Sequence, residues 1–538
     1  MGIYILVFIS LILRLLLIDK PEGLWNDEYV SYMIAATPFA DGFWQAVKSQ
    51  CHMPFYYLYL KFFMTIFGQS DLLLRLTSVI PGVLAVIVMY FCGLEKDKKT
   101  GLTSALLTAI SSFLIYYSQE VRFYSLLFLF SAMSLLYTLR IIKNVNVKNL
   151  ILYVISNFLI LFTHTIGFVY VFFNLVFVSI FLFKDYKKYI LRLWGIIVLS
   201  GLAAMPLVVN IFTTKSISQW WGHFTFSRYG FLMSDYFSPV LTNLVNAPDS
   251  FFFNFKSGFI IFALTPMLIA CFWIIKSLFN RKNLMLFFIC IATVVVMTIA
   301  AILGKLVFIT KYSIEIYPIL IYLASIGAMS ISNKPARNII LVFYISLNLI
   351  FLAVSPLSAF RLPRNQGHKI ATDLIKSMNP QSNDIILLQY YTKARFEKYF
   401  DFSPYRVYDI SKGNYFEYIS AGTDYETAMV SGKTIYKKFF SNSYSGYFSL
   451  KLENDIFNNL KAGDSLIILI FDDSALYMPD VMAKIVEDEN IYKNTPFLFL
   501  VFSLIKNQTL FAASEKLEIT GFQKKGAWSA AKFTKLNK

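Results

Sequence analysis

Residues 75–93 read RLTSVIPGVLAVIVMYFCG, and this stretch decides the fold. It carries one charged residue, Arg75, at its start. An apolar run of about 17 to 25 residues is long enough to cross a bilayer as a helix. The next residues, 94–100, read LEKDKKT, so three lysines follow the run directly. We therefore predict a membrane span followed by a short basic loop.

Apolar runs of this kind recur through the first two thirds of the chain. Its 538 residues are 57% hydrophobic and only 15% charged, and the mean hydropathy is +0.58. A soluble domain carries about 25% charged residues, so a disordered chain and a single soluble core are both excluded. We predict an α-helical, multi-pass membrane protein. Its eleven spans lie near 3–18, 75–93, 102–117, 123–142, 150–163, 166–183, 190–212, 257–279, 284–303, 312–331 and 338–355.

The charged residues are unevenly distributed. Residues 1–355 hold 39 of the 81 Asp, Glu, Lys and Arg, whereas the shorter stretch 356–538 holds the other 42. The second density is that of a soluble protein. Helix-like and strand-like runs alternate there, which is typical of α/β layers. We predict a transmembrane domain over 1–355 and a C-terminal α/β domain over 356–538, with no phosphate-loop or dinucleotide fingerprint in the latter.

The basic residues indicate the orientation of the spans. With a cytoplasmic N-terminus, the inner loops near 94–101, 140–149, 184–192, 276–283 and 332–337 contain 15 Lys or Arg and three acids. That asymmetry follows the positive-inside rule, so the net charge of +17 points to membrane topology rather than to a nucleic-acid partner. The odd number of spans then places 356–538 outside the cytoplasm.

One apolar run does not fit this pattern of spans. Residues 52–67 read HMPFYYLYLKFFMTIF and carry Lys61 in the middle. Counting this run as a span would turn every later basic loop outward. We therefore expect a helix that lies in the outer membrane interface, with its aromatic rings at headgroup depth.

An acidic pair lies in the first outer segment. Residues 25–29 read WNDEY, so Asp27 and Glu28 follow Trp25 and Asn26. One interpretation is structural, because Asn26 is a favoured N-cap and acids in a first helical turn complement the helix dipole. The other is chemical, because a carboxylate at the membrane surface can act as a base or a metal ligand. The pair alone does not decide between them.

A second set of ionisable residues joins two spans at residues 118–124, which read SQEVRFY. Glu120 and Arg122 would contribute only about 0–1 kcal/mol if they formed an exposed ion pair. Ionisable groups at the ends of apolar spans are functional candidates by default. His52, His164 and Lys311 fall on the same outer side, although each of them alone is explained equally well by a structural role.

Taken in order, these motifs resemble those of the GT-C superfamily of membrane glycosyltransferases. The branch is that of the protein mannosyltransferases and the bacterial lipid A aminoarabinose and polysaccharide transferases. The resemblance covers about residues 20–320. In this chain Met53 replaces a Pro, and Lys311 replaces an Arg, which keeps the charge but loses a bidentate phosphate contact. The matching stretches are Asp27-Glu28, His52-Met53-Pro54-Phe55-Tyr56-Tyr57, Arg75-Leu76-Thr77-Ser78, Ser118-Gln119-Glu120-Val121-Arg122-Phe123-Tyr124, Thr163-His164 and Lys311-Tyr312.

The resemblance implies a GT-C fold, with periplasmic juxtamembrane helices beside the spans. It also implies an inverting hexosyl- or pentosyltransferase that takes a sugar from a polyprenyl-phosphate donor. The acceptor, a lipid, a glycan or a protein, would lie on the outer face of the bacterial cytoplasmic (inner) membrane. A divalent metal near Glu120, His52 or His164 is left open, because metal dependence varies in the superfamily, and no nucleotide cofactor is expected.

The resemblance also assigns roles to individual residues. Asp27 is expected to be the base that activates the acceptor hydroxyl, with Glu28 as its neighbour or substitute and Glu120 as a further catalytic carboxylate. Arg122 and Lys311 are expected to stabilise the departing lipid phosphate. The substrate-binding set is His52, Tyr56, Tyr57, Arg122, Tyr124, His164, Lys311 and Tyr312.

Three other functions compete with this one. A transporter or flippase of lipid-linked sugars usually binds near the bilayer midplane between repeated halves, and we find no repeat. A polysaccharide polymerase depends on arginines, whereas acidic residues dominate here. A sensor or scaffold would not require Asp27, Glu120 and Arg122 together. The identity of the sugar and of the acceptor stays open.

Overall fold

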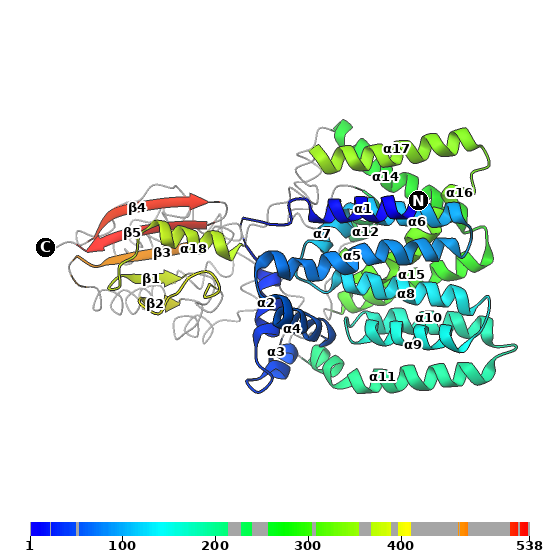
Figure 1. Cartoon of the computed structure of the whole chain (residues 1–538), viewed down its shortest axis with the longest axis horizontal. Coiled ribbons are helices and arrows are strands. Elements are labelled where there is room, and N and C mark those ends of the chain that lie inside the picture. The colour runs from blue at the N-terminus through cyan, green and yellow to red at the C-terminus, as the bar shows by residue number, and fades with distance from the viewer. Residues whose placement is uncertain are drawn as a thin grey trace. The chain divides into compact units, whose positions relative to one another are not determined.

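The structure is a computed structural model, and it describes most of the first two thirds of the chain and part of the last third. The chain divides into two compact units (Figure 1). Met1–Asp19 and Val30–Pro363 form the first, here called the membrane unit, and Lys20–Tyr29 and Arg364–Lys538 form the second, the C-terminal unit. The described residues are 2–21, 23–49, 53–213, 227–238, 257–303, 308–354, 367–388, 396–409, 461, 463–471, 517–525 and 528–535.

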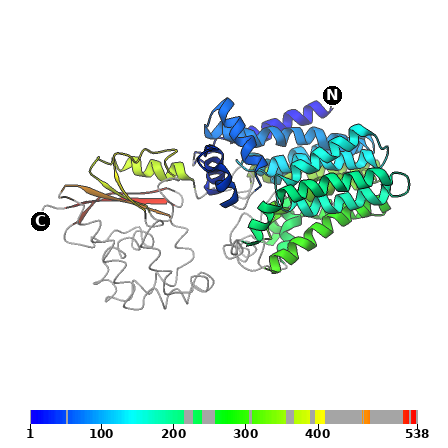
Figure 2. The ribbon, with the colours of Figure 1, turned by 90° about the horizontal axis from the view of Figure 1, so that it is seen from below.

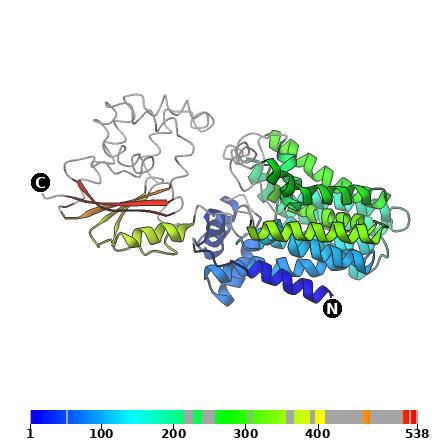
Figure 3. The same cartoon turned by 90° about the horizontal axis from the view of Figure 1, so that it is seen from above.

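The membrane unit is a bundle whose long helices run side by side in Figure 1, Figure 2 and Figure 3. Each of the eleven predicted spans coincides with a helix or with a bent pair of helices. The elements are α1 (Gly2–Leu15), α5 (Asp71–Leu94), α6 (Lys98–Ile110), α7 (Ser112–Ser118), α8 (Tyr124–Ile141), α9 (Val147–Leu161), α10 (Gly167–Leu182), α11 (Lys187–Thr213), α14 (Ser257–Ser277), α15 (Arg281–Ile302), the 3₁₀ segment η2 (Thr310–Ile316), α16 (Tyr317–Met329) and α17 (Lys334–Val354).

The helices differ in their capacity to cross a membrane. In the described part of the chain, six are long and apolar enough to do so alone, and α6 with α7 forms a pair bent by 57° that makes a seventh. Shorter apolar helices, α1, α9, α10 and part of α14, occupy the other predicted spans. The chain is therefore a multi-span membrane protein, as its composition predicts.

The bundle has an inside and an outside. The apolar windows of α8 and of η2 with α16 are 83% buried, whereas those of α11 and α17 are 17% and 28% buried. Side chains on α11 and α17 thus remain available to lipid, while α8 and α16 pack against protein on nearly all sides. Both inner elements begin at the same group of polar residues, which forms the candidate site described below.

The predicted inner loops are fixed by capping and by one ion-pair cluster. Glu95 pairs with Arg140 at 2.9 Å and with Lys143 at 2.8 Å, and so joins the loop after α5 to the loop after α8. Burial raises the pKa of the Glu95 carboxyl, but its bonds to Lys143 and Arg140 outweigh burial and hold that pKa below its ordinary value. In these loops, side-chain oxygens also cap the helices that follow: Asp97, Asn146 and Asn280.

Three short helices lie at one end of the bundle (Figure 1): α2 (Asn26–Ala36), α3 (Phe43–Ser49) and α4 (Phe55–Phe67). Lys61 of α4 donates to the carbonyl oxygens of Ala35 at 3.0 Å and Thr37 at 2.8 Å. The charge thus satisfies carbonyls at the end of α2, where a cation is favourable. A lysine in the middle of this apolar run therefore serves to anchor α2.

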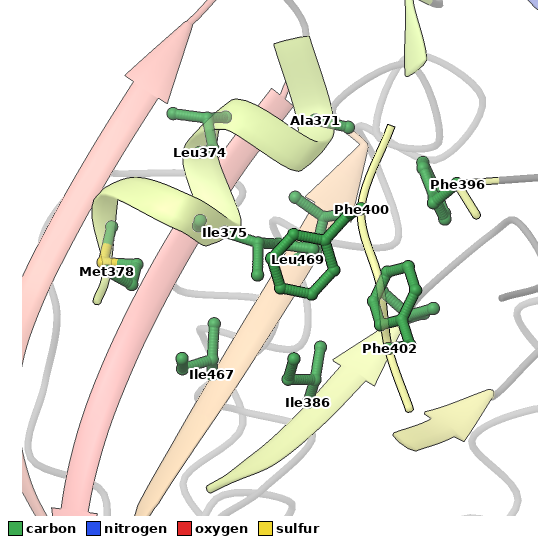
Figure 4. Close-up of a cluster of buried hydrophobic side chains, with 12 residues drawn as sticks. Ala371, Leu374, Ile375, Met378, Ile386, Phe396, Phe400, Phe402, Ile467 and Leu469 are labelled. Carbon is green, nitrogen blue, oxygen red and sulfur yellow. The ribbon is translucent and has the colours of Figure 1, made fainter. Parts of the chain in front are cut away.

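The described residues of the C-terminal unit form a five-stranded sheet of order β2-β1-β3-β5-β4. The strands β1 (Ile385–Leu388), β2 (Arg406–Asp409) and β3 (Ser465–Phe471) are parallel, while β5 (Trp528–Lys535) pairs antiparallel with both β3 and β4 (Leu517–Lys525). The helix α18 (His368–Ser377) packs on one face. Figure 4 shows the resulting core, a cluster of buried side chains that includes Leu374 and Ile375 of α18 and Ile467 and Leu469 of β3. The described part is an α/β layer, as predicted.

Candidate active site

The turn between α7 and α8 holds Glu120 and Arg122 in the interior of the membrane unit. Their exposed fractions are 1% and 4%, so a solvent-screened surface pair does not describe them. The backbone of the turn is fixed from α5, because the Ser78 hydroxyl is within hydrogen-bond distance of the carbonyl oxygens of both residues. The Arg122 guanidinium also donates to the Ser31 hydroxyl at 3.3 Å. The motif beginning at Arg75 therefore contributes Ser78 as a support for this turn.

Two cations approach the ring of one tyrosine. The guanidinium carbon of Arg122 lies 5.9 Å from the ring centroid of Tyr124, and Lys311 Nζ lies 5.6 Å from the same centroid. Lys311 Nζ is also 5.6 Å from the ring of Tyr312. Both cationic side chains are buried, at 4% and 5% exposure, so a charge that they bind is held largely away from water. The arrangement is therefore complementary to an anionic group such as a phosphate.

His164 connects the turn that carries Arg122 to the 3₁₀ segment η2. Its ring stacks on Phe123 at 5.0 Å and on Tyr312 at 5.8 Å, measured between ring centroids. Its Nδ1 lies 2.7 Å from Glu315 Oε1, and Glu315 is fully buried. The hydrogen bond at Nδ1 fixes the orientation of the imidazole in its plane, and it leaves Nε2 as the second ring nitrogen.

Glu315 was not predicted as a site residue. It lies between Ile314 and Ile316 at the start of an apolar span, where a carboxylate is costly without a partner. That position was a usable signal, because an acid within an apolar run needs a buried donor. The donor is His164, which precedes it by 151 residues, so sequence spacing alone does not reveal the pair.

The tyrosines of α4 border the same region. The Tyr56 ring lies 6.3 Å from Phe123 and 5.5 Å from Tyr57, and both tyrosines are fully buried. Burial raises the pKa of Tyr56 well above its ordinary value. Its hydroxyl therefore stays protonated at physiological pH and is available as a donor. The amide of Phe55 donates to the carbonyl of Phe162 at 3.0 Å, which ties α4 to the end of α9.

The acidic pair opens α2 and belongs to the C-terminal unit. The helix begins at Asn26, so the predicted N-cap role of Asn26 is wrong and Trp25 occupies that position. Glu28 Oε2 accepts from the Trp25 amide at 3.1 Å, the contact of a capping box. Glu28 is fully buried, whereas Asp27 is partly exposed. The capping contact gives Glu28 a structural role that Asp27 does not share.

The segment that carries the pair is bound to the C-terminal α/β layer. The amide of Leu24 donates to the Tyr399 hydroxyl at 2.9 Å, and its carbonyl lies 3.0 Å from His368 Nδ1. The His368 ring also lies 4.8 Å from that of Tyr29. The start of α2 is thus positioned by α18 and by the residues that follow β1.

The predicted site residues therefore fall into three groups. Within the membrane unit, ring and cation–π contacts, with Phe123 as an intermediate, connect seven of them: Tyr56, Tyr57, Arg122, Tyr124, His164, Lys311 and Tyr312. Glu120 lies in the same turn as Arg122. Asp27 and Glu28 belong to the other unit. His52 lies outside the described residues.

The residues that could hold a metal are few in the part of the chain that the structure describes. No group of three or more His, Cys, Asp or Glu side chains is arranged there to bind an ion. His164 and Glu315 supply two donors that already bond to each other. Among the described residues, these two donors do not complete a metal site on their own.

Comparisons with known proteins indicate the fold. Residues 51–211 match the family model described as dolichyl-phosphate-mannose-protein mannosyltransferase. The crystal structure of ArnT from Cupriavidus metallidurans in the apo state is similar over 98% of this chain and 97% of its own, with a TM-score of 0.52 and 10% identity. This chain has the GT-C glycosyltransferase fold. No curated protein matches it.

A second structure of ArnT gives the same result for the fold. ArnT from Cupriavidus metallidurans bound to undecaprenyl phosphate is similar with a TM-score of 0.50 and 11% identity, again over 98% and 97% of the two chains. The likeness extends over the whole length, so it includes both the membrane unit and the C-terminal unit. The GT-C resemblance predicted from the motifs is thereby confirmed at the level of fold.

The His164–Glu315 pair makes a first testable prediction. We expect His164→Phe, which keeps the ring stacking, and Glu315→Met each to destabilise the protein by about 1–3 kcal/mol, because each leaves a buried polar partner without its hydrogen bond. The double variant is expected to lose less free energy of unfolding than the sum of the losses in the two single variants. Thermal unfolding of the purified protein in detergent measures all three. Additive losses would contradict a direct coupling.

Proposed function

We propose that this chain is an inverting glycosyltransferase that moves a sugar from a polyprenyl-phosphate donor to an acceptor. The observation that carries the proposal is the pair of cations, Arg122 and Lys311, on the ring of Tyr124. The family model is named after a lipid-phosphate sugar, and one similar structure is bound to undecaprenyl phosphate. Both support a lipid-phosphate donor for this chain.

The reaction creates negative charge on the departing lipid phosphate. The bond between the anomeric carbon and the phosphate oxygen breaks, and that oxygen keeps the electron pair. Arg122 and Lys311 are already fixed in a buried environment, so they stabilise the developing charge without having to reorganise. His164, held by Glu315, has its Nε2 available as a hydrogen-bond partner beside Tyr312. Leaving-group stabilisation is thus assigned to the membrane unit.

The acceptor hydroxyl has to lose its proton while it attacks the anomeric carbon from the opposite face. We assign Asp27 as the base. Glu28 is less suited, since one of its oxygens accepts the Trp25 amide and its side chain is buried. A positioned carboxylate contributes about 10²–10⁴-fold to such a step. Attack opposite the leaving phosphate inverts the anomeric configuration.

The location of the reaction follows from the charge distribution of the sequence. We propose that the turn that carries Glu120 and Arg122 lies on the outer face of a bacterial cytoplasmic membrane, as do residues 356–538, because the basic loops favour that orientation. An acceptor of lipid, glycan or protein nature would then reach the site from outside. We propose that the C-terminal unit handles this acceptor, because the segment carrying Asp27 is bound to it.

The decisive experiment measures the fate of the donor. Purified protein in liposomes is given polyprenyl phosphate carrying a radiolabelled hexose or pentose, with a crude envelope extract as acceptor source. We expect release of free polyprenyl phosphate and transfer of label to the acceptor fraction, both lost in Arg122→Met. Parallel samples with a chelator establish whether a divalent metal takes part. Movement of intact donor across the bilayer without release would instead indicate a flippase.

A further inference from the structure

A buried arginine lies in the last turn of α1, the first apolar helix of the membrane unit. Arg14 belongs to α1, an apolar helix, and its side chain is fully buried. Charged side chains within apolar spans are costly and are retained where they have a defined partner. Arg14 has several. Its Nη1 donates to the Ser10 hydroxyl at 2.6 Å and lies 3.4 Å from the Ser10 carbonyl, so its own helix supplies part of the set.

The other partners lie at the break between α6 and α7. Helix α6 ends at Ile110 and α7 begins at Ser112, with a bend of 57° between them. The last four carbonyls of a helix have no partner within it, and inside a membrane no water replaces that partner. Arg14 donates to two of them, to Ala109 O at 3.1 Å and to Thr108 O at 3.2 Å.

The same arginine reaches the end of α7. Its Nε donates to the Ser118 hydroxyl at 3.2 Å. Gln119, the next residue, bonds to the end of α1 in turn. Its Nε2 donates to the carbonyls of Arg14 at 3.1 Å and Leu16 at 2.7 Å. Gln119 immediately precedes Glu120. The interactions that support the bend are therefore continuous with the turn that carries the two predicted site residues.

The packing around these groups leaves little room for rearrangement. A Cβ at Gly82 of α5 would lie 2.3 Å from Ser118 Oγ and 3.0 Å from Arg14 Nε, so only glycine permits this approach. Three transmembrane elements, α1, α5 and α7, thus meet around one guanidinium. A lysine at position 14 cannot reproduce these contacts, since a single ammonium cannot reach the three separate acceptors on α6 and α7 that the planar guanidinium reaches.

We propose that Arg14 is a positioning residue for the transfer site. It stabilises the bend between α6 and α7, and with Gln119 it fixes the turn that presents Glu120 and Arg122. Its effect on catalysis rests on the proposed function, whereas its effect on the turn does not. The alternative, an anchor that extends toward lipid headgroups, does not account for a fully buried side chain with acceptors on α6 and α7.

Hydrogen exchange of the full-length protein in detergent tests the effect on the turn. In Arg14→Met we expect amides of residues 111–123 to exchange about tenfold faster or more, while α14–α17 keep their protection. In Arg14→Lys, the exchange rates of these amides should lie between those of the wild type and Arg14→Met. Ile12→Met, a change at a position of α1 that is 47% exposed, is the matched control and should exchange like the wild type.

Donor turnover by the same variants tests the effect on catalysis. We expect kcat for release of polyprenyl phosphate to fall about 10–100-fold in Arg14→Met, with a smaller change in KM, because misplaced catalytic groups slow the reaction more than they weaken binding. Arg14→Lys should recover part of kcat. If Arg14→Met does not fold, Arg14→Lys and Gln119→Met carry both measurements.

The outcomes separate the two proposals. Unchanged exchange at 111–123 in a folded Arg14 variant would overturn the positioning role, whatever the activity. Faster exchange spread evenly over all helices would overturn it as well, because the residue would then support the fold in general. A wild type that shows no turnover, while the exchange pattern is as expected, would count against the proposed function and leave the positioning of the turn supported.

Discussion

Replacing Asp27 with Asn is expected to lower the rate of sugar transfer by about 10²–10⁴-fold, the contribution of a general base. The substitution keeps the size of the side chain and the start of α2, so substrate binding and expression should change little. The rate is measured as release of polyprenyl phosphate from a labelled donor in the presence of acceptor. Because the acceptor and not the donor needs the base, donor binding should persist in the variant.

Glu28→Gln is the matched control for this prediction. It removes the negative charge at the start of α2 but keeps an oxygen that can accept the Trp25 amide, so it should cost only about 0.3–1 kcal/mol of stability. Its effect on kcat should be much smaller than that of Asp27→Asn. Loss of activity in Glu28→Gln with normal activity in Asp27→Asn would reverse the assignment. Normal activity in both variants would move the role of base to Glu120.

Features that depend on neighbouring residues could be predicted from the sequence, whereas features that depend on contacts between distant residues could not. Membrane spans are local, because about 20 apolar residues suffice, and the stretch 75–93 together with its basic loop predicts α5 almost to its ends. The interfacial run around Lys61 shows the limit of that method. Charge balance excludes a span there, but the bonds from Lys61 to Ala35 and Thr37 depend on a helix packed alongside.

The candidate site likewise contains residues that motifs predict and residues that they do not. Arg122, Lys311 and His164 are found from motifs because they stand at the ends of apolar spans. Glu315 and Arg14 lie within apolar runs, and their partners are 151 and about 95 residues away, so no local pattern connects them. The α6–α7 bend is equally hidden, because Ser111 alone gives no sign that a guanidinium from α1 replaces the missing helical bonds.

The second large effect is expected at the two cations on Tyr124. Arg122→Met should lower kcat by about 10²–10³-fold, the loss typical when one preorganised group that stabilises a developing oxyanion is removed. Lys311→Met should have a smaller effect, since an ammonium offers no bidentate contact to phosphate. Both variants are compared by single-turnover release of polyprenyl phosphate, which isolates the chemical step from product dissociation.

The conservative replacements distinguish charge from shape. Lys311→Arg should retain activity, because it keeps the charge and adds the fork that suits phosphate, whereas Arg122→Lys should be impaired through loss of its contact to Ser31. The double variant Arg122→Met with Lys311→Met should be less impaired than the product of the single effects if both cations act on one phosphate. Multiplicative effects would mean that the two cations act on different groups, and the leaving phosphate would then be stabilised by only one of them.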